Sequence, residues 1–379
     1  MKGVFDVKKR ILFIIPNLKH GGAEKVLVNL ANNLDRDKYD ITVHTLFDVG
    51  VHKKNLMPHI TYHYFFPKEF RANSYLFKCF SPKFWWKCMV KEEYDIAISY
   101  LEGPTTRILS GCPNPNTKLV AWLHIELTTP QLAAQGFRSL LEAKKAYEKF
   151  DRIIAVSQNV KQCFIENLQV QHTIEVLYNT NETEQIQYKA LIPVQDNCFT
   201  TGDIPTVISV AKLMQTKGYD RLIEVHKKLL KEGLNHRIYI LGIGEEQSYL
   251  EKKIKEYQLE ESFILLGFHD NPYQYVANAD LYVCSSRREG FSTAVTEALI
   301  VGTPVVSTEC SGARELLGEN NEYGIVVENS TEGIYQGMKR MLSDTALLAH
   351  YKEQAKMRGA SFSRENTVNA VEQMFDIIL

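Results

Sequence analysis

Short apolar runs alternate with longer amphipathic stretches from one end of the chain to the other. Each apolar run predicts a buried strand, and each stretch with a helical period predicts an amphipathic helix. The expected strands lie at 10–15, 41–46, 95–99, 119–123, 153–156, 174–177, 206–210, 237–241, 263–266, 280–284, 305–307 and 324–327. The clearest expected helices lie at 23–34, 139–150, 219–231, 245–257 and 364–378. Alternation of this kind is typical of parallel sheets with helices on both faces.

The alternation breaks once, over residues 179–203, a polar stretch without a clear period. We therefore expect an N-terminal domain over 1–180, a linker over 181–203 and a C-terminal domain over 204–362. The last helix has no strand after it, so we expect residues 363–379 to pack back on the first domain. The predicted fold class is α/β, with two facing, doubly wound, Rossmann-like domains and ligands in the cleft between them.

The amino-acid composition of the chain excludes some classes of function. The chain of 379 residues is 45% hydrophobic and 23% charged, which is typical of a soluble globular protein. Lys+Arg 44 against Asp+Glu 45 gives a net charge of −1, so we expect no nucleic-acid partner. Without a membrane-spanning run or a signal peptide, the expected location is cytoplasmic. The cysteines are expected to be reduced packing residues without structural zinc: Cys79, Cys88, Cys112, Cys163, Cys198, Cys284 and Cys310.

The segment Glu-Gly-Phe-Ser-Thr-Ala-Val-Thr-Glu at 289–297 carries the strongest indication of function. It follows the strand at 280–284 and leads into a helix that begins near Ser292. Glu289 thus lies in the loop and Glu297 about one turn inside the helix, with the backbone N–H groups of the helix start between them. Such groups attract phosphate, and carboxylates accept hydrogen bonds from hydroxyl groups. The two glutamates could instead be solvated surface charges, but their context favours a nucleotide-sugar site.

Two lysines follow the first strand of the predicted second domain. Lys212 and Lys217 lie on the strand-to-helix loop after 206–210, where they could neutralise a diphosphate leaving group. Taken alone, they would be interpreted as a pair of solvated lysines. His124 ends the apolar strand at 119–123; a structural role is the usual interpretation, although clefts form at such strand ends.

Gly21 and Gly22 separate the first strand from the first helix, so they allow a ligand to approach the backbone, or they form a tight turn. The Asp-Arg-Asp sequence at 35–37 follows a helix and not a strand, so we interpret it as a helix-exit loop. We expect no metal site.

Aromatic and basic residues are interleaved over 62–91. This mixture suits the headgroup layer of an anionic membrane. An amphipathic helix with its aromatics in the core explains the pattern equally well, and base stacking with nucleic acid explains it less well.

Together these features resemble the retaining glycosyltransferases of family four, which have the two-domain GT-B fold. The resemblance spans the chain through residues 21–24, His124, 151–157, 217–222, 289–297 and 302–306. It implies that Glu297 holds the ribose hydroxyls and Glu289 the donor sugar. It implies that Lys217 binds phosphate, together with Lys212 in place of the family's arginine. The expected donor-binding residues are Gly22, Gly290, Phe291, Ser292, Thr293, Ala294, Glu297 and Phe268, and the expected catalytic residues are Glu289, His124, Lys217 and Lys212.

The expected reaction is transfer of a sugar from a nucleotide-diphosphate sugar, with UDP as the expected nucleotide, to an acceptor hydroxyl. The resemblance implies retention of configuration, no metal or other cofactor, and a glycan or lipid-linked saccharide acceptor of surface polysaccharide synthesis. Residues 62–91 would then contact the inner face of the membrane. Two alternatives are a sugar-nucleotide epimerase of similar fold and a non-catalytic partner that binds a nucleotide sugar. A phosphorylase fits less well, because the chain is short and offers no evident lysine for a pyridoxal cofactor.

Overall fold

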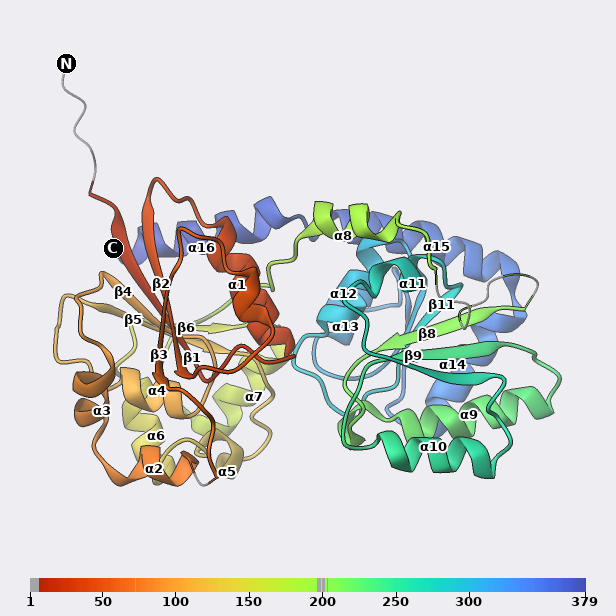
Figure 1. Cartoon of the computed structure of the whole chain (residues 1–379), viewed down its shortest axis with the longest axis horizontal. Helices are drawn as coiled ribbons and strands as arrows, with labels where there is room; N and C mark the ends of the chain where they lie inside the picture. Colours follow the sequence, from red (N-terminus) through yellow and green to blue (C-terminus); the bar gives the residue numbers. More distant parts are fainter. Residues whose placement is uncertain (1–6, 72, 196–198, 200–201, 203) are drawn as a thin grey trace, which may run out of the picture. The chain divides into compact units, whose positions relative to one another are not determined.

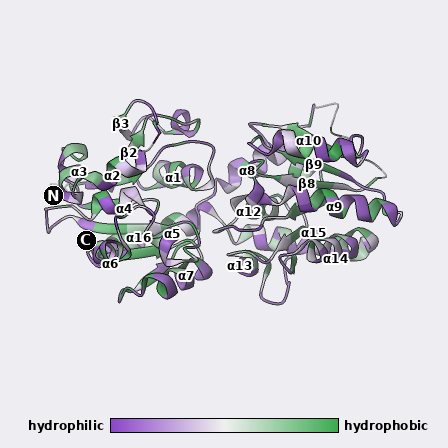
Figure 2. Cartoon of the chain, turned by 90° about the horizontal axis from the view of Figure 1, so that it is seen from below, coloured by the Kyte–Doolittle hydropathy of each residue, from purple (hydrophilic) through white to green (hydrophobic). Residues whose placement is uncertain are grey.

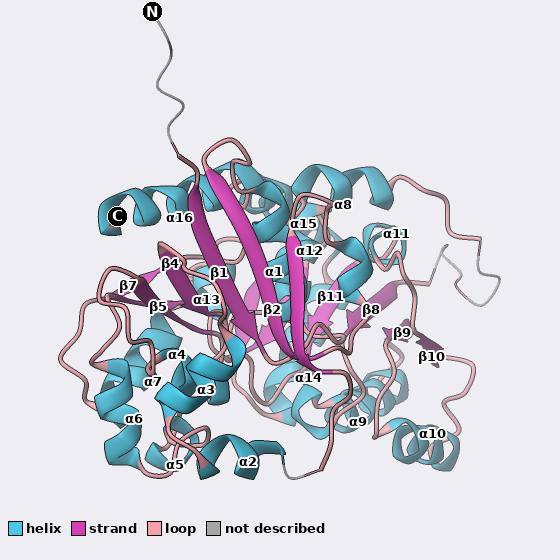
Figure 3. Ribbon diagram, turned by 60° about the vertical axis from the view of Figure 1, so that its left-hand side comes forward, coloured by secondary structure: helices cyan, strands magenta, loops and turns pink. Residues whose placement is uncertain are grey.

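The chain forms two compact α/β units (Figure 1). The computed structural model describes residues 7–71, 73–195, 199, 202 and 204–379. The first unit comprises Met1–Asn181 together with Arg364–Leu379, and the second comprises Glu182–Ser363. Each unit has one parallel sheet with helices on both of its faces (Figure 3). The predicted fold class is therefore confirmed for each unit.

The sheet of the first unit has the order β3-β2-β1-β4-β5-β6-β7. Its interior strand β1 is buried from Ile11 to Ile15, which explains its continuous apolar run. The chain winds outward from β1 in both directions, and right-handed crossovers place the connecting helices on opposite faces. The strands are β1 (Lys9–Ile15), β2 (Tyr39–Phe47), β3 (Thr61–Phe66), β4 (Ile96–Ser99), β5 (Lys118–Leu123), β6 (Arg152–Ala155) and β7 (Ile174–Val176).

Several helices of this unit begin at serine or threonine caps. The Ser139 and Ser157 side chains each accept a hydrogen bond from a backbone N–H of the first turn that follows. The C-terminal helix α16 (Arg364–Ile378) belongs to this unit: Phe375 packs on Tyr39 with ring centroids 5.6 Å apart. The other helices are α1 (Gly22–Asn33), η1 (His52–Asn55), α2 (Asn73–Cys79), α3 (Pro82–Met89), α4 (Pro104–Leu109), α5 (Pro130–Ala133), α6 (Leu140–Tyr147) and α7 (Gln158–Leu168).

The sheet of the second unit has the order β10-β9-β8-β11-β12-β13. Its strands are β8 (Thr206–Val210), β9 (Arg237–Leu241), β10 (Phe263–Gly267), β11 (Leu281–Cys284), β12 (Val305–Thr308) and β13 (Ile325–Val327). Its helices are α8 (Thr183–Ala190), η2 (Gln215–Lys217), α9 (Tyr219–Lys231), α10 (Gln247–Glu256), α11 (Tyr273–Ala277), α12 (Thr293–Ile300), α13 (Ala313–Leu317), α14 (Thr331–Ser343) and α15 (Thr345–Ala360). Strands are mainly hydrophobic, whereas helices carry both kinds of residue, since only one of their faces packs on the core (Figure 2).

The stretch expected to be a linker contains a helix. Residues 183–190 form α8, which belongs to the second unit and packs on α11 and α12. Ile186 is buried, and the Asn271 side chain donates to the carbonyl of Lys189 at 2.9 Å. Eight residues show too little of a helical period to stand out in a polar sequence. Cys198, one of the cysteines expected to be a packing residue, lies outside the described part of the chain.

The aromatic and basic stretch 62–91 divides between core and surface. It begins with β3, a strand that the sequence did not predict, at one end of the sheet order. Phe77, Trp85 and Trp86 are buried, so the core interpretation holds for them. Tyr75 on α2 and Phe84 on α3 are 72% and 43% exposed, so it fails for these two. Among the described residues no helix is long and apolar enough to cross a membrane.

Candidate active site

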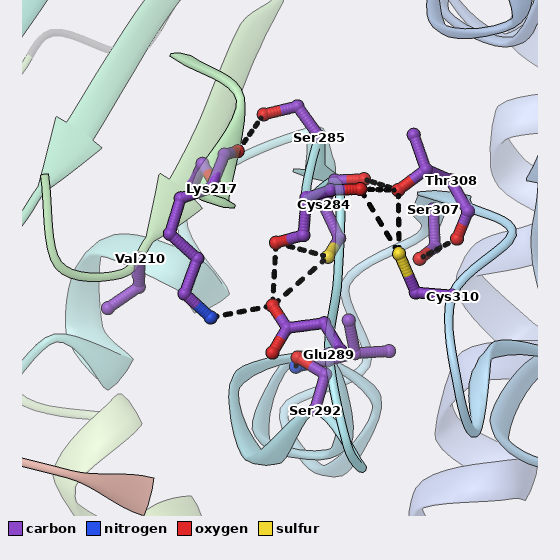
Figure 4. A network of polar contacts seen from close by, with 12 residues as sticks. Val210, Lys217, Cys284, Ser285, Glu289, Ser292, Ser307, Thr308 and Cys310 are labelled. Atoms are coloured by element: carbon purple, nitrogen blue, oxygen red, sulfur yellow. Dashed lines mark hydrogen bonds and ion pairs between the residues drawn. The ribbon is translucent and has the colours of Figure 1, made fainter. Parts of the chain in front are cut away.

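Loops that follow neighbouring parallel strands meet at one edge of the second sheet. β8 and β11 are adjacent, so the β8–α9 loop lies beside the β11–α12 loop. The first loop carries Lys217 and the second carries Glu289. Their side chains meet, with Lys217 Nζ 2.7 Å from Glu289 Oε1 (Figure 4). The structure thus brings together two of the four expected catalytic residues.

The ion pair is mostly shielded from solvent: the Lys217 and Glu289 side chains are 21% and 14% exposed. Ser286 Oγ donates to the same carboxylate oxygen at 2.6 Å. Burial by itself lowers the pKa of Lys217, but the Glu289 carboxylate outweighs it, so the pKa lies above its ordinary value. The lysine is therefore a permanent cation, and Glu289 accepts hydrogen bonds from Lys217 and Ser286.

The two loops are joined by further contacts. Ser285 Oγ donates to the carbonyl of Lys217 at 2.8 Å, and the Arg287 N–H donates to the carbonyl of Thr216 at 2.7 Å. Gly218 has φ +69°, and a Cβ there would lie 2.2 Å from the Ser285 carbonyl oxygen. Only glycine combines that conformation with so close an approach, so the packing of the loops requires glycine at position 218.

Helix α12 begins where the sequence predicts. Ser292 is its N-cap, and the Ser292 side chain accepts from the Val295 N–H at 3.4 Å. Thr293 and Ala294 are the first two helical residues, so their backbone N–H groups belong to the helix start. Glu297 lies one turn further along the helix and is buried, as are the ring of Phe291 and most of the helix. Gly290, which precedes Phe291, is partly exposed.

His124 directly follows β5 in the first unit, as expected from the sequence. Its ring packs on Tyr100 with centroids 4.7 Å apart, and its Nε2 is buried without a hydrogen-bond partner. Burial lowers the pKa of His124 to about 3, so the imidazole is neutral at physiological pH. It can therefore donate or accept one hydrogen bond but cannot serve as a cationic acid.

The turn that carries His124 is held by a glutamate that the sequence did not single out as a site residue. The carboxylate of Glu102 accepts the backbone N–H groups of His124 and Ile125 at 3.1 and 2.7 Å. Burial raises the pKa of Glu102 to about 7, although these hydrogen bonds act in the opposite direction. The only signal for this contact is that Glu102 follows β4, because β4 is the neighbour of β5 in the sheet.

The remaining predicted residues lie on other segments of the two units. Lys212 is exposed at the start of the β8–α9 loop, and Phe268 is half exposed after β10. Gly22 is the first residue of α1, and a Cβ on the preceding Gly21 would collide with the carboxylate of Glu24. That carboxylate ends a flexible side chain that can move aside, so the collision does not by itself require glycine before the helix.

The residues described by the structure contain no group of three or more His, Cys, Asp or Glu placed to hold a metal ion. The Asp-Arg-Asp sequence lies between α1 and β2, as expected of a helix-exit loop. There the Asp35 carboxylate accepts the Asp37 N–H, and the Asp35 N–H donates to Glu372 of α16. The six described cysteines form no disulfide bond.

Two family models match the chain in succession. Residues 20–185 match Glycosyltransferase Family 4, and residues 199–358 match Glycosyl transferases group 1. The structure is similar to that of Anabaena HepE in complex with UDP and glucose, with a TM-score of 0.77 and 21% identity over 97% of this chain and 99% of that one. At this identity the likeness concerns the fold alone.

Two relatives add to this family assignment. An N-acetylgalactosaminyltransferase of Campylobacter jejuni that acts on a diphospho-undecaprenol-linked saccharide is 35% identical over 63% of this chain. The match spans 65% of that relative, just under two thirds of its length. A glycosyltransferase of Haemophilus influenzae is 23% identical over 95% of this chain and 98% of its own length. The chain belongs to the glycosyltransferases of family four and group 1, and it has their two-domain GT-B fold.

Proposed function

We propose that this protein transfers a sugar from a UDP-sugar to a hydroxyl of a lipid-linked saccharide, with retention of anomeric configuration and without a metal ion. The observation that carries the proposal is the contact between Lys217 and Glu289 at the carboxyl edge of the second sheet. A fixed cation and a fixed carboxylate beside the start of α12 suit a ligand that combines a diphosphate with sugar hydroxyls.

The charges of these groups suggest how the donor is activated. When the glycosidic bond breaks, negative charge grows on the diphosphate and positive charge on the sugar ring. Lys217 and the backbone N–H groups at the start of α12 stabilise the first charge, and Glu289 stabilises the second and orients the sugar hydroxyls. In this proposal Glu297 binds the ribose, and Lys212 adds charge from the edge of the loop. His124, a neutral hydrogen-bonding group, contacts the donor sugar.

The contacts of Glu289 support retention without a covalent intermediate. Its carboxylate is engaged by a lysine and a serine hydroxyl, so it is poorly placed to act as a free nucleophile. We therefore propose that the acceptor attacks the face from which UDP departs. The acceptor proton then passes to an oxygen of the leaving phosphate, the acceptor oxygen forms the new bond to the anomeric carbon, and UDP is released.

A lipid-linked acceptor is supported by two observations. The Campylobacter relative acts on an undecaprenol-linked saccharide. The first unit also exposes a patch of aromatic and basic residues on and beside α2 and α3, called here the α2–α3 patch: Phe70, Tyr75, Phe80, Lys83, Phe84 and Lys87. Exposed rings next to lysines suit an anionic membrane surface. We propose that this patch contacts the cytoplasmic face of the membrane that holds the acceptor.

Binding of UDP without metal tests the donor site. We expect UDP, in the presence of EDTA, to raise the melting temperature of the purified protein more than GDP, ADP or CMP does. A ligand that binds only the native state at about 100 times its dissociation constant adds roughly 2.7 kcal/mol of stability. Stabilisation by UDP only after Mg²⁺ is added would contradict the metal-free site. Conversion of UDP-sugar to an epimer without acceptor would show that the enzyme is an epimerase.

Vesicle binding tests the α2–α3 patch. Replacement of Phe80 and Phe84 by serine should weaken binding to phosphatidylglycerol vesicles at least about tenfold, because each ring contributes about 1.5–3 kcal/mol when it is buried in the membrane interface. Tyr188→Ser in the second unit, at a side chain that is 70% exposed, is the matched control and should bind as wild type does. Equal binding by all three proteins, or no binding by wild type, would exclude this membrane contact.

A further inference from the structure

Asn329 connects the loops around the candidate active site, although it contributes nothing to the Lys217–Glu289 pair directly. It lies in the β13–α14 loop and is exposed on its outer side. Its Nδ2 donates to the carbonyl of Arg287 at 3.0 Å and, at 3.4 Å, to the carbonyl of Glu309. One carboxamide thus contacts the β11–α12 loop and the β12–α13 loop from a third loop.

The carboxamide oxygen of Asn329 holds a buried arginine. Arg221, near the start of α9, donates from Nη1 and Nη2 to Asn329 Oδ1, both at 3.0 Å. Nη1 also donates to the backbone carbonyl of Asn329 at 3.3 Å, and Nη2 to the carbonyl of Ser285 at 2.7 Å. Arg221 is 8% exposed, and within the described part of the chain no carboxylate forms an ion pair with it. A buried guanidinium held by neutral oxygens depends strongly on each of them.

These contacts form a continuous path to the catalytic carboxylate. Asn329 holds Arg221, and Arg221 holds the Ser285 carbonyl. The next residue, Ser286, donates to Glu289. The same asparagine also binds the Arg287 carbonyl directly. The backbone carbonyl of Asn329 adds one longer contact with Arg221, at 3.3 Å, but only the side chain also reaches Arg287, so the carboxamide makes most of the connection.

We propose that Asn329, acting through Arg221, is a positioning residue that holds the segment 285–289 in the conformation that binds the donor. The inference rests on the proposed function only for the identity of the ligand. The path of hydrogen bonds predicts that loss of the carboxamide loosens this segment and weakens nucleotide binding, while the core of the second unit remains folded.

Asn329→Ala tests the proposal in two ways. The backbone N–H of Arg287, which bonds to the Thr216 carbonyl, should exchange with solvent at least about tenfold faster, since opening of the segment breaks that bond. The dissociation constant of UDP, measured by titration calorimetry, should rise about tenfold. Asn320→Ala is the matched control, because Asn320 is an exposed asparagine of the same unit that bonds only within its own turn, to Glu322. It should change neither quantity.

Asn329→Asp separates positioning from a general loss of structure. Aspartate keeps an oxygen acceptor for Arg221 but cannot donate to the Arg287 carbonyl, so exchange and UDP affinity should lie between those of wild type and Asn329→Ala. Wild-type exchange at Arg287 in Asn329→Ala would overturn the inference whatever the ligand. If exchange at Arg287 is faster in Asn329→Ala but the wild-type protein binds no nucleoside diphosphate, the positioning role is upheld and the proposed function is refuted.

Discussion

Glu289→Gln is expected to lower the rate of sugar transfer at least about 1000-fold and to leave the melting temperature within a few degrees of wild type. Glutamine has the same shape and keeps an oxygen that can accept from Ser286 Oγ, now 2.6 Å from the carboxylate. It removes the negative charge that, in the proposed mechanism, faces the sugar ring where positive charge develops in the transition state. A loss of about 1000-fold corresponds to about 4 kcal/mol of transition-state stabilisation, which is typical for a preorganised group in a shielded site.

The measurement is release of UDP from a UDP-sugar with a lipid-linked acceptor, at saturating donor, together with the dissociation constant of UDP. UDP itself lacks the sugar that Glu289 contacts, so its affinity should change little. Glu309→Gln is the control: Glu309 also pairs with a cation at 2.7 Å, Arg314, but its side chain is half exposed. It should leave the rate within about twofold. Undiminished transfer by Glu289→Gln would remove Glu289 from the mechanism.

Lys217→Met is expected to impair both catalysis and stability. Transfer should fall about 100-fold or more and UDP should bind at least about tenfold more weakly, because the cation for the diphosphate is lost. In addition, Glu289 would remain largely buried without its partner, which should cost about 2 kcal/mol of stability and several degrees in melting temperature. Activity, calorimetric titration with UDP and thermal unfolding measure the three effects.

The double variant Lys217→Met/Glu289→Gln distinguishes the two causes. It contains no unpaired charge, so its melting temperature should return toward that of wild type while its activity stays low. Lys339→Met serves as the control, because Lys339 pairs with Glu232 at 2.8 Å on the surface, where loss of a partner leaves a hydrated carboxylate. If the double variant melts as low as Lys217→Met, the ion pair does not explain the stability of the two loops.

The alternation of strands and helices could be predicted because most of the parallel strands are buried on both faces and therefore contain apolar runs, as in residues 11–15 of β1 and in β11. The elements that escaped prediction are those with weaker local signals. Helix α8 has eight residues and a polar surface, and β3, at the end of the sheet order, is only partly buried along its length. Neither carries an apolar run or a sustained helical period, so tertiary packing decides its conformation.

The residues of the candidate site also divide into those that could be predicted from the sequence and those that could not. Glu289, Lys217 and the start of α12 could be recognised because a strand, a loop with glycine and a helix start have local sequence signals. Glu102 and Asn329 could not, because each acts on backbone groups of segments that are distant in the sequence. Arg221 and Asn329, for example, are 108 positions apart and meet only because β8 and β13 belong to one sheet.

The sequence by itself determined the α/β class, the strand ends at which polar residues gather, and the charges available there, since hydrophobic burial and helix capping depend on neighbouring residues. The tertiary structure alone decided that Lys217 and Glu289, 72 positions apart, form a shielded ion pair. It also decided which aromatics of 62–91 are buried, and that one asparagine joins three loops. Those outcomes depend on the order of strands in the sheet, which places the ends of distant segments side by side.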